Sequence, residues 1–423
     1  MSNDALRAEV ESLTSSISRQ QLRLRVLQAQ LDSIVYPVLT LPPEITSEIF
    51  LQCVPIEWER DGVNKREAPL LLTQICGDWR RTAVSTPALW TTFEVRYSTP
   101  GLVHLPEIAE TWLSRACGCP LTVNIWGVFP AECKRTFETF QRHASTVEVL
   151  KLNVNSKALE AMETYPWDCP TLRSLSVSFI SLEYPLVHPL EIIKNAPLLQ
   201  EVFMTCTLPS SVTLPWRQLT RFTAAFNSLA ECLEGLHLMP NLTYCALAQS
   251  SMPPPPFSSE SPLSLPRVQH LVLFNYDTPP FGSNTILRFL ILPALQNLEI
   301  RDFPFDEEHL DTFLVRSSPP LRHLSIQPPR GHFGGTSLRL SPSFTMLGLT
   351  SLNIWRPSAS FAVAFFERLG GDLAFLPDLL HLSFHGCRDT SGETNETTLV
   401  EMAAPAVLIR GTGGQGHTQL QHF

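Results

Sequence analysis

Apolar residues recur at alternating four- and three-residue steps along the first 38 positions. The stripe consists of Leu6, Val10, Leu13, Ile17, Leu24, Leu27, Leu31, Ile34 and Val38, with Gln20 as its one polar interruption. This is the heptad pattern of a helix that pairs with another helix. The pattern predicts a helix that ends at Tyr36–Pro37 and is either a coiled coil that dimerises the protein, with Gln20 helping to fix its register, or a single amphipathic helix.

Three more helices are predicted between Leu41 and Val95. They begin at Pro42–Pro43, at Pro69 and at Thr86–Pro87, because proline is tolerated in a first helical turn. Their apolar faces consist of Ile45, Ile49 and Cys53, then Leu72, Ile75, Trp79 and Ala83, and finally Leu89 and Trp90. So small a cluster buries little surface, so we expect part of it to meet another protein.

A different period follows these helices. Residues 92–97 and 120–126 alternate like strands, and 105–116 and 131–143 read as helices. A unit L-x-x-L-x-L then occurs in ten copies, 20 to 30 residues apart, which start at Val147, Leu172, Leu199, Leu219, Leu242, Val268, Leu295, Leu321, Leu349 and Leu379. Each copy predicts one strand that buries its leucines only by stacking on its neighbours.

Alternate residues of these strands should share the face opposite the leucines. We predict that this face binds a protein through His270, Phe274, Asn297, Glu299, Arg301, His323, Gln327, Asn353, Trp355, His381 and His385. Aromatic and arginine side chains dominate protein interfaces, which favours this interpretation over a merely solvated surface. The three histidines His270, His323 and His381 fall on alternate copies, roughly 10 Å apart, too far to share one metal.

Composition narrows the function classes. The formal net charge of −9 gives no support for binding nucleic acid, and 44% hydrophobic residues are ample for a large core. The ten cysteines include no C-x-x-C pair, so we expect buried thiols in a reducing compartment. With no secretion signal and no run of eighteen apolar residues, we expect a soluble intracellular protein, cytoplasmic or nuclear, that binds no membrane.

Two further motifs have ordinary explanations. The glycines of GTGGQG, at 411–416, fit a dinucleotide pattern, but only seven residues follow, too few for the helix that such a site requires. The run MPPPPFSSESP at 252–262 could offer a polyproline ligand, although a stiff surface loop is the more usual role. We therefore expect no catalytic residues, metal or cofactor.

The order of residues in the three predicted helices resembles the F-box. Matching positions are Leu41, Pro42, Glu44, Ile45, Ile49, Phe50, Leu71, Leu72, Ile75, Cys76, Trp79, Arg80, Ala83, Leu89 and Trp90. The link from Pro55 to Ala68 is longer and more charged than usual. The resemblance implies docking on a Skp-type adaptor, and through it on a cullin, by Leu41, Pro42, Ile45, Ile49, Phe50, Leu72, Ile75, Trp79 and Trp90.

The copies that follow resemble the leucine-rich repeats found behind many F-boxes, although the usual asparagine or cysteine after the last leucine is present only at Asn155, Asn227 and Cys387. We expect an α/β chain with an N-terminal helix over 1–38, a three-helix F-box over 39–95, a leucine-rich-repeat solenoid with a curved parallel sheet over 96–389, and a flexible tail over 390–423. The predicted function is substrate recognition for a Skp/cullin/F-box ubiquitin ligase. The alternatives are a scaffold that degrades nothing and an enzyme using the C-terminal glycines.

Overall fold

The computed structural model describes residues 3–32, 37–55, 63–97, 104–130, 133–164, 166–180, 189–205, 209–226, 229–249, 262–275, 286–302, 307–327, 348–357, 359–372 and 374–385. The chain divides into two compact units, Met1–Trp90 and Thr91–Phe423. The glycine motif, the predicted tail over 390–423 and the proline-rich run up to Ser261 lie outside the described residues.

The first unit is helical. It opens with α1 (Asn3–Asp32), a single helix of 30 residues. The remaining helices are η1 (Pro37–Thr40), α2 (Pro43–Gln52), α3 (Leu72–Ile75), α4 (Gly77–Val84) and η2 (Pro87–Trp90). Phe50 and Trp90 are buried at its centre, where the Trp90 indole N–H donates to the Ala83 carbonyl at 2.8 Å. The rings of Phe50 and Trp79 lie 5.0 Å apart and join α2 to α4.

One predicted helix is two helices in the structure. The segment opened by Pro69 was expected to remain helical through Ala83, but α3 ends at Ile75 and α4 begins at Gly77. Cys76 between them is extended (φ −153°, ψ 173°), and its Sγ accepts the Trp79 N–H at 3.5 Å as an N-cap. A side chain that caps a new helix competes with continuation of the old one, which explains the break.

The second unit contains a sheet of twelve parallel strands in chain order. The strands are β1 (Thr92–Tyr97), β2 (Leu121–Gly127), β3 (Val147–Val154), β5 (Ser174–Phe179), β7 (Glu201–Thr205), β8 (Arg221–Phe226), β9 (Tyr244–Gln249), β11 (His270–Asn275), β13 (Asn297–Arg301), β14 (His323–Gln327), β15 (Ser351–Trp355) and β16 (His381–His385). The first, β1, pairs with β2 and so belongs to the sheet, although the expected F-box range includes its first residues. Each of the ten predicted copies supplies one strand.

The repeated leucines form the core of this unit. In the seventh copy Leu295, Leu298 and Ile300 are all 0% exposed. Strand pairing aligns Leu298 with Leu271 of β11 and Leu324 of β14, so apolar residues stack in rows across the sheet. Burying a leucine contributes about 2 kcal/mol, and a single strand cannot cover it, so every copy depends on its neighbours.

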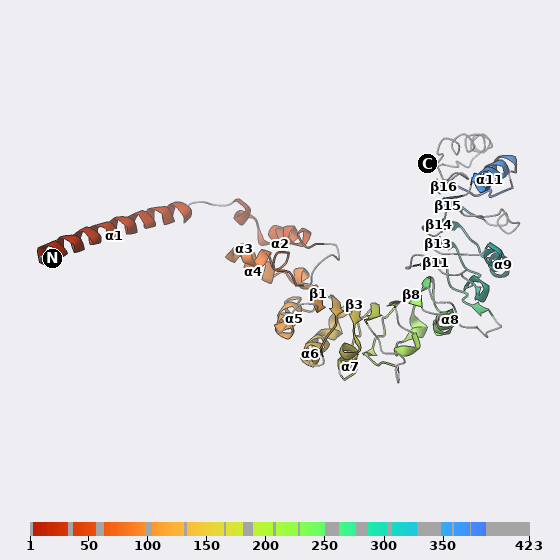
Figure 1. Cartoon of the computed structure of the whole chain (residues 1–423), viewed down its shortest axis with the longest axis horizontal. Helices are drawn as coiled ribbons and strands as arrows, with labels where there is room; N and C mark the ends of the chain where they lie inside the picture. The colour runs from red at the N-terminus through yellow and green to blue at the C-terminus, as the bar shows by residue number, and fades with distance from the viewer. Residues whose placement is uncertain are drawn as a thin grey trace. The chain divides into compact units, whose positions relative to one another are not determined.

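The segments between strands vary in structure. Helices follow some strands: α5 (Leu105–Arg115), α6 (Lys134–His143), α7 (Ser156–Thr164), α8 (Leu229–His237), α9 (Glu307–Ser317) and α11 (Ala359–Gly371). Other links contain the short helices η5 (Ala144–Thr146), η6 (Pro209–Ser211), η7 (Trp216–Gln218) and η8 (Ile286–Phe289), and the strand pairs β4 (Trp167–Asp168) with β6 (Ile193–Asn195) and β10 (Leu263–Ser264) with β12 (Leu290–Ile291). Figure 1 shows the α-helices of this unit along one side of the strands, so that no described α-helix covers the other sheet face.

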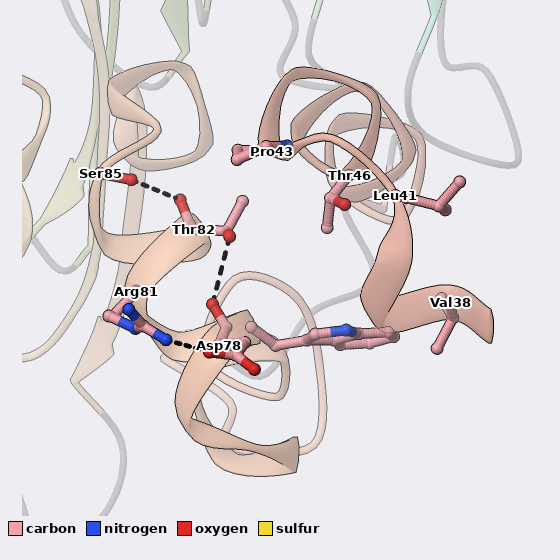
Figure 2. A pocket seen from close by; sticks show the side chains of 9 residues that line it. Val38, Leu41, Pro43, Thr46, Asp78, Arg81, Thr82 and Ser85 are labelled. Atoms are coloured by element: carbon pink, nitrogen blue, oxygen red, sulfur yellow. Dashed lines mark hydrogen bonds and ion pairs between the residues drawn. The ribbon is translucent and has the colours of Figure 1, made fainter. Parts of the chain in front are cut away.

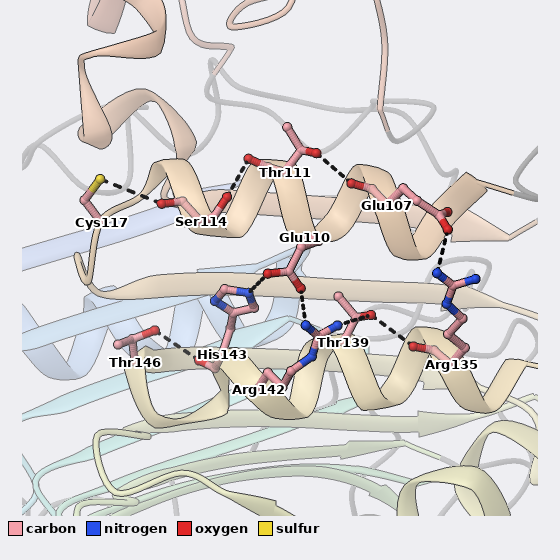
Figure 3. Close-up of polar contacts among 10 residues, drawn as sticks. All are labelled: Glu107, Glu110, Thr111, Ser114, Cys117, Arg135, Thr139, Arg142, His143 and Thr146. Atoms are coloured by element: carbon pink, nitrogen blue, oxygen red, sulfur yellow. Dashed lines mark hydrogen bonds and ion pairs between the residues drawn. The ribbon is translucent and has the colours of Figure 1, made fainter.

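Ion pairs join α5 to α6 on their outer surface (Figure 3). Glu110 lies between Arg142 and His143, with Oε2 2.9 Å from Arg142 Nη1 and Oε1 3.4 Å from His143 Nε2. A second pair joins Glu107 and Arg135 at 3.0 Å. The carboxylate side chains are 42% and 50% exposed, so solvent weakens both attractions.

We expect Glu110→Gln to lower the free energy of unfolding by at most about 1 kcal/mol, because surface ion pairs contribute little. Urea denaturation of both proteins measures the difference. The difference in free energy of unfolding should be smaller still in 1 M salt, where the Debye length is about 3 Å. A loss above about 2 kcal/mol that persists in salt would show that this carboxylate has a structural role beyond the ion pairs.

Burial makes two thiols unreactive. It raises the pKa of Cys245 to about 12, and burial followed by the charge of Asp168 does the same for Cys169. At pH 8 a maleimide should therefore label the exposed Cys53 and Cys117 and spare these two until the chain is unfolded. Peptide mass spectrometry identifies the labelled cysteines.

The same two thiols make the stability of the protein depend on pH. Because the pKa values of Cys169 and Cys245 are raised in the folded chain, their contribution to the free energy of unfolding is fully present below pH 9 and should be lost as the pH rises toward 12.

Candidate functional site

Apolar side chains are exposed on and beside helices α2 and α3 of the first unit. Leu41, two residues before α2, and Ile45 and Ile49 within it follow one another at four-residue steps and are 38%, 49% and 45% exposed. Leu71, the N-cap residue of α3, and Ile75, its last residue, are 41% and 53% exposed. Both helices pack on α4. We call these five residues the α2–α3 apolar set. So many exposed aliphatic side chains in so small a unit indicate a protein contact surface.

The nine predicted adaptor residues fall into two groups. Leu41, Pro42, Ile45, Ile49 and Ile75 are exposed, and Trp79 is half-buried. Phe50, Leu72 and Trp90 are buried at 1%, 4% and 0% exposure, so they form the core that supports the α2–α3 apolar set and offer little surface themselves. Leu71 was matched to the F-box but omitted from the predicted contacts. Its position four residues before Ile75 is the signal that identifies it.

A pocket of about 400 Å³ adjoins this surface. Figure 2 shows Val38, Leu41, Pro43 and Thr46 on one side of it and residues of α4 on the other. The α4 side consists of Asp78, Trp79, Arg81, Thr82 and Ser85. Asp78 and Arg81 form an exposed ion pair at its edge, so the pocket combines an apolar wall with a charged rim. That combination suits one large side chain of a partner protein.

The eleven predicted target residues all lie on β11, β13, β14, β15 and β16. Register places His270 opposite Asn297, Asn297 opposite His323, and Ser351 opposite both His323 and His381. The three histidines therefore lie on alternate strands, as the spacing of the copies predicted. None of the eleven side chains is buried, so together they form a continuous polar and aromatic strip, which we call the β11–β16 strip.

Side chains of this strip hold one another in place. Asn297 Nδ2 lies 2.7 Å from His270 Nδ1, and Glu299 forms an ion pair with Arg301 on the same strand. The Trp355 and His385 rings, paired across β15 and β16, stack with centroids 4.2 Å apart and planes 25° apart. Trp355 remains 38% exposed. The strip therefore presents an ordered aromatic surface at its C-terminal end.

Hydrogen bonds tie together the strand ends beside that aromatic pair. Asp302, just after β13, has left-handed backbone (φ 48°), and its N–H donates to the Gln327 carbonyl at 2.9 Å. Gln327 Nε2 in turn donates to Asp302 Oδ2 at 3.2 Å. Arg356 is also left-handed (φ 51°), and its N–H donates to the His385 carbonyl. The Arg356 bond thus fixes the backbone immediately after Trp355 against β16.

The polar row extends farther along the sheet than predicted. Arg221 of β8 lies 4.2 Å from the Tyr244 ring of β9 and 3.3 Å from a Glu201 oxygen of β7, and Tyr244 neighbours His270. Arg221 and Tyr244 occupy the slot two residues after the first leucine, the same slot as the three histidines. This shared position in the repeat could have identified Arg221 and Tyr244 from the sequence alone.

The part of the chain that the structure describes shows no cluster of three His, Cys, Asp or Glu side chains suited to a metal ion. Among the described helices, none is both long and apolar enough to cross a bilayer. No protein-family model and no curated protein sequence matches the chain.

Proposed function

We propose that the chain is the substrate-recognition subunit of a Skp/cullin/F-box ubiquitin ligase. In this proposal the helices from Pro37 to Trp90 are an F-box, and the twelve-stranded unit is a leucine-rich-repeat solenoid that binds a target protein. The observation that carries it is the α2–α3 apolar set, five exposed aliphatic residues at positions where the sequence resembles an F-box. The chain would contribute proximity, and the assembled ligase would transfer ubiquitin.

The exposed residues support an adaptor contact. An interface core depleted of charge with a charged rim is typical of specific complexes. The aliphatic residues of the α2–α3 apolar set supply the core, while Asp78 and Arg81 supply charge at the edge of the neighbouring pocket. The buried Phe50 and Trp90 give this surface a rigid support.

The sheet face that no described α-helix covers supports a target contact. Its β11–β16 strip combines tryptophan, arginine and histidine, and the Trp355–His385 stack fixes the largest aromatic side chain of the strip in place. Tryptophan and arginine are the residue types most enriched among interface hot spots. The target surface would carry an apolar residue for Trp355 and polar groups for its neighbours.

Reconstitution tests the proposal. The full chain is mixed with a purified Skp-type adaptor and cullin, and complex formation is measured by size-exclusion chromatography. Ubiquitin transfer is then assayed after addition of the RING subunit, the ubiquitin-activating and ubiquitin-conjugating enzymes, ubiquitin and ATP. A stable complex that ubiquitylates proteins bound by the sheet unit is the expected result. Formation of the complex with no ubiquitylation of any bound protein would favour the scaffold alternative, and absence of adaptor binding would reject the F-box assignment.

Trp355→Ala should reduce target binding about 30-fold or more, because hot-spot side chains contribute about 2 kcal/mol or more. The control is Trp126→Ala, since Trp126 is 48% exposed on β2 of the same sheet and lies outside the strip. Quantitative mass spectrometry of proteins co-purified with each variant reads the effect. Equal losses for both variants would contradict the placement of the target site on the β11–β16 strip.

A further inference from the structure

The helix α1 presents an apolar stripe to solvent along its length. Leu6, Val10, Leu13, Ile17, Leu24 and Leu27 are 45%, 61%, 57%, 54%, 61% and 52% exposed. The helix contains several hydroxyl residues, and two of them bond back to the carbonyl four residues earlier, Thr14 to Val10 at 2.7 Å and Ser18 to Thr14 at 2.9 Å. Such bonds weaken a helix slightly, so burial of this stripe against a partner would stabilise α1.

Heptad positions indicate what that partner is. The stripe places β-branched Val10 and Ile17 at a positions and Leu6, Leu13 and Leu27 at d positions. β-Branched residues at a with leucine at d favour a pair of parallel helices over larger helical assemblies. In a parallel pair the flanking g and e positions bring Glu9 to Thr14, Ser16 to Gln21 and Arg23 to Gln28 of the other helix, so no like charges meet.

Gln20, the one polar seam residue, decides the orientation. In a parallel, in-register pair each Gln20 faces the Gln20 of the other copy, and the two amides donate and accept hydrogen bonds. An antiparallel pair stacks d residues on a residues, so Gln20 would face Ile17 where the two helices overlap most, and Val10 or Leu24 when the register is shifted by one heptad. That arrangement buries an amide without a partner, which is unfavourable.

We propose that α1 binds α1 of a second copy of this chain as a parallel, in-register, two-stranded coiled coil with a Gln20–Gln20 layer. The dimer would carry two α2–α3 apolar sets and two β11–β16 strips in one particle. If the proposed ligase function holds, both receptors would engage a target with two sites at high effective concentration. The self-association itself does not depend on that function, so its test uses the chain without adaptor.

Two leucines of similar exposure provide a matched test. Leu24 is 61% exposed at an a position, and Leu22 is 65% exposed on the opposite side of the helix at an f position. Light scattering of the full chain should give about twice the chain mass of 47.4 kDa. Leu24→Asp should reduce this to a single chain mass, and Leu22→Asp should leave it unchanged. A monomeric parent chain, a trimer, or equal effects of the two substitutions would overturn the proposal.

Cross-linking tests the orientation. Leu13→Cys places two cysteines opposite each other only in a parallel, in-register pair, so mild oxidation should yield a covalent dimer that the parent chain, with its native cysteines, does not form under the same conditions. Absence of that cross-link in a chain that dimerises would overturn the parallel arrangement. Adaptor binding by Leu24→Asp is measured separately, so a dimer that binds no adaptor rejects the ligase function and leaves this inference standing.

Discussion

Replacing Ile45 and Ile75 together with aspartate is expected to weaken adaptor binding at least about 100-fold, since hot-spot side chains each contribute about 2 kcal/mol or more. The two residues lie on α2 and α3 and are 49% and 53% exposed. A complex that covers them must bury two carboxylates among aliphatic groups, and unpaired buried charge strongly opposes association.

Isothermal titration calorimetry with the purified adaptor measures this loss. The thermal unfolding midpoint should stay within a few degrees of the parent chain, because exposed positions change stability by about 0.5 kcal/mol or less. The matched control is Leu198→Asp, which places the same charge at an apolar residue that is 42% exposed in the other unit. Full adaptor affinity in the double variant would falsify the docking role of the α2–α3 apolar set.

The sheet could be predicted well because its sequence signal is redundant. A strand that buries leucines at fixed positions must repeat them in every copy, so an error at one copy is corrected by the others. All ten predicted copies lie in the one parallel sheet. The first copy at Val147 and the last at Leu379 both begin with a residue that is buried, at 1% and 2% exposure.

The helical unit was less predictable for a physical reason. Helices α2, α3 and α4 are short, and apolar residues lie on more than one of their faces. Periodicity alone therefore does not separate the face that meets the core from the face that meets solvent. Phe50 and Ile49 are adjacent in sequence and equally apolar, yet one is 1% and the other 45% exposed. The break at Cys76 also depends on a local cap that a hydrophobic pattern does not record.

The polar face was predicted only for the sixth to tenth copies, so its extent along the sheet was underestimated. The same slot holds Arg221 and Tyr244 in earlier copies, where different side chains produce an equivalent polar row. Strand register places Tyr244 beside His270, and Arg221 beside Tyr244. The position of a residue within its copy therefore predicts this face better than the type of residue does.

Asn155→Ala is expected to lower the free energy of unfolding of the sheet unit by about 3 kcal/mol, since buried polar groups left unpaired cost about 1 to 3 kcal/mol each. Asn155 follows β3 and is 9% exposed. Its Oδ1 accepts the Phe129 N–H and its Nδ2 donates to the Phe129 carbonyl, both at 2.9 Å. Removing the amide leaves both backbone groups of Phe129 without these bonds beside a buried ring.

The control for this substitution is Asn195→Ala. Asn195 ends β6, is exposed, and its side chain donates to Asp168 at 3.1 Å. Because water can replace that bond, the loss should be about 0.5 kcal/mol or less. Urea denaturation followed by tryptophan fluorescence compares the two variants. Equal losses would mean that the segment between β2 and β3 adjusts so that the backbone groups of Phe129 find other hydrogen-bond partners. The stacked leucines would then be sufficient to hold the first strands together without the Asn155 hydrogen bonds.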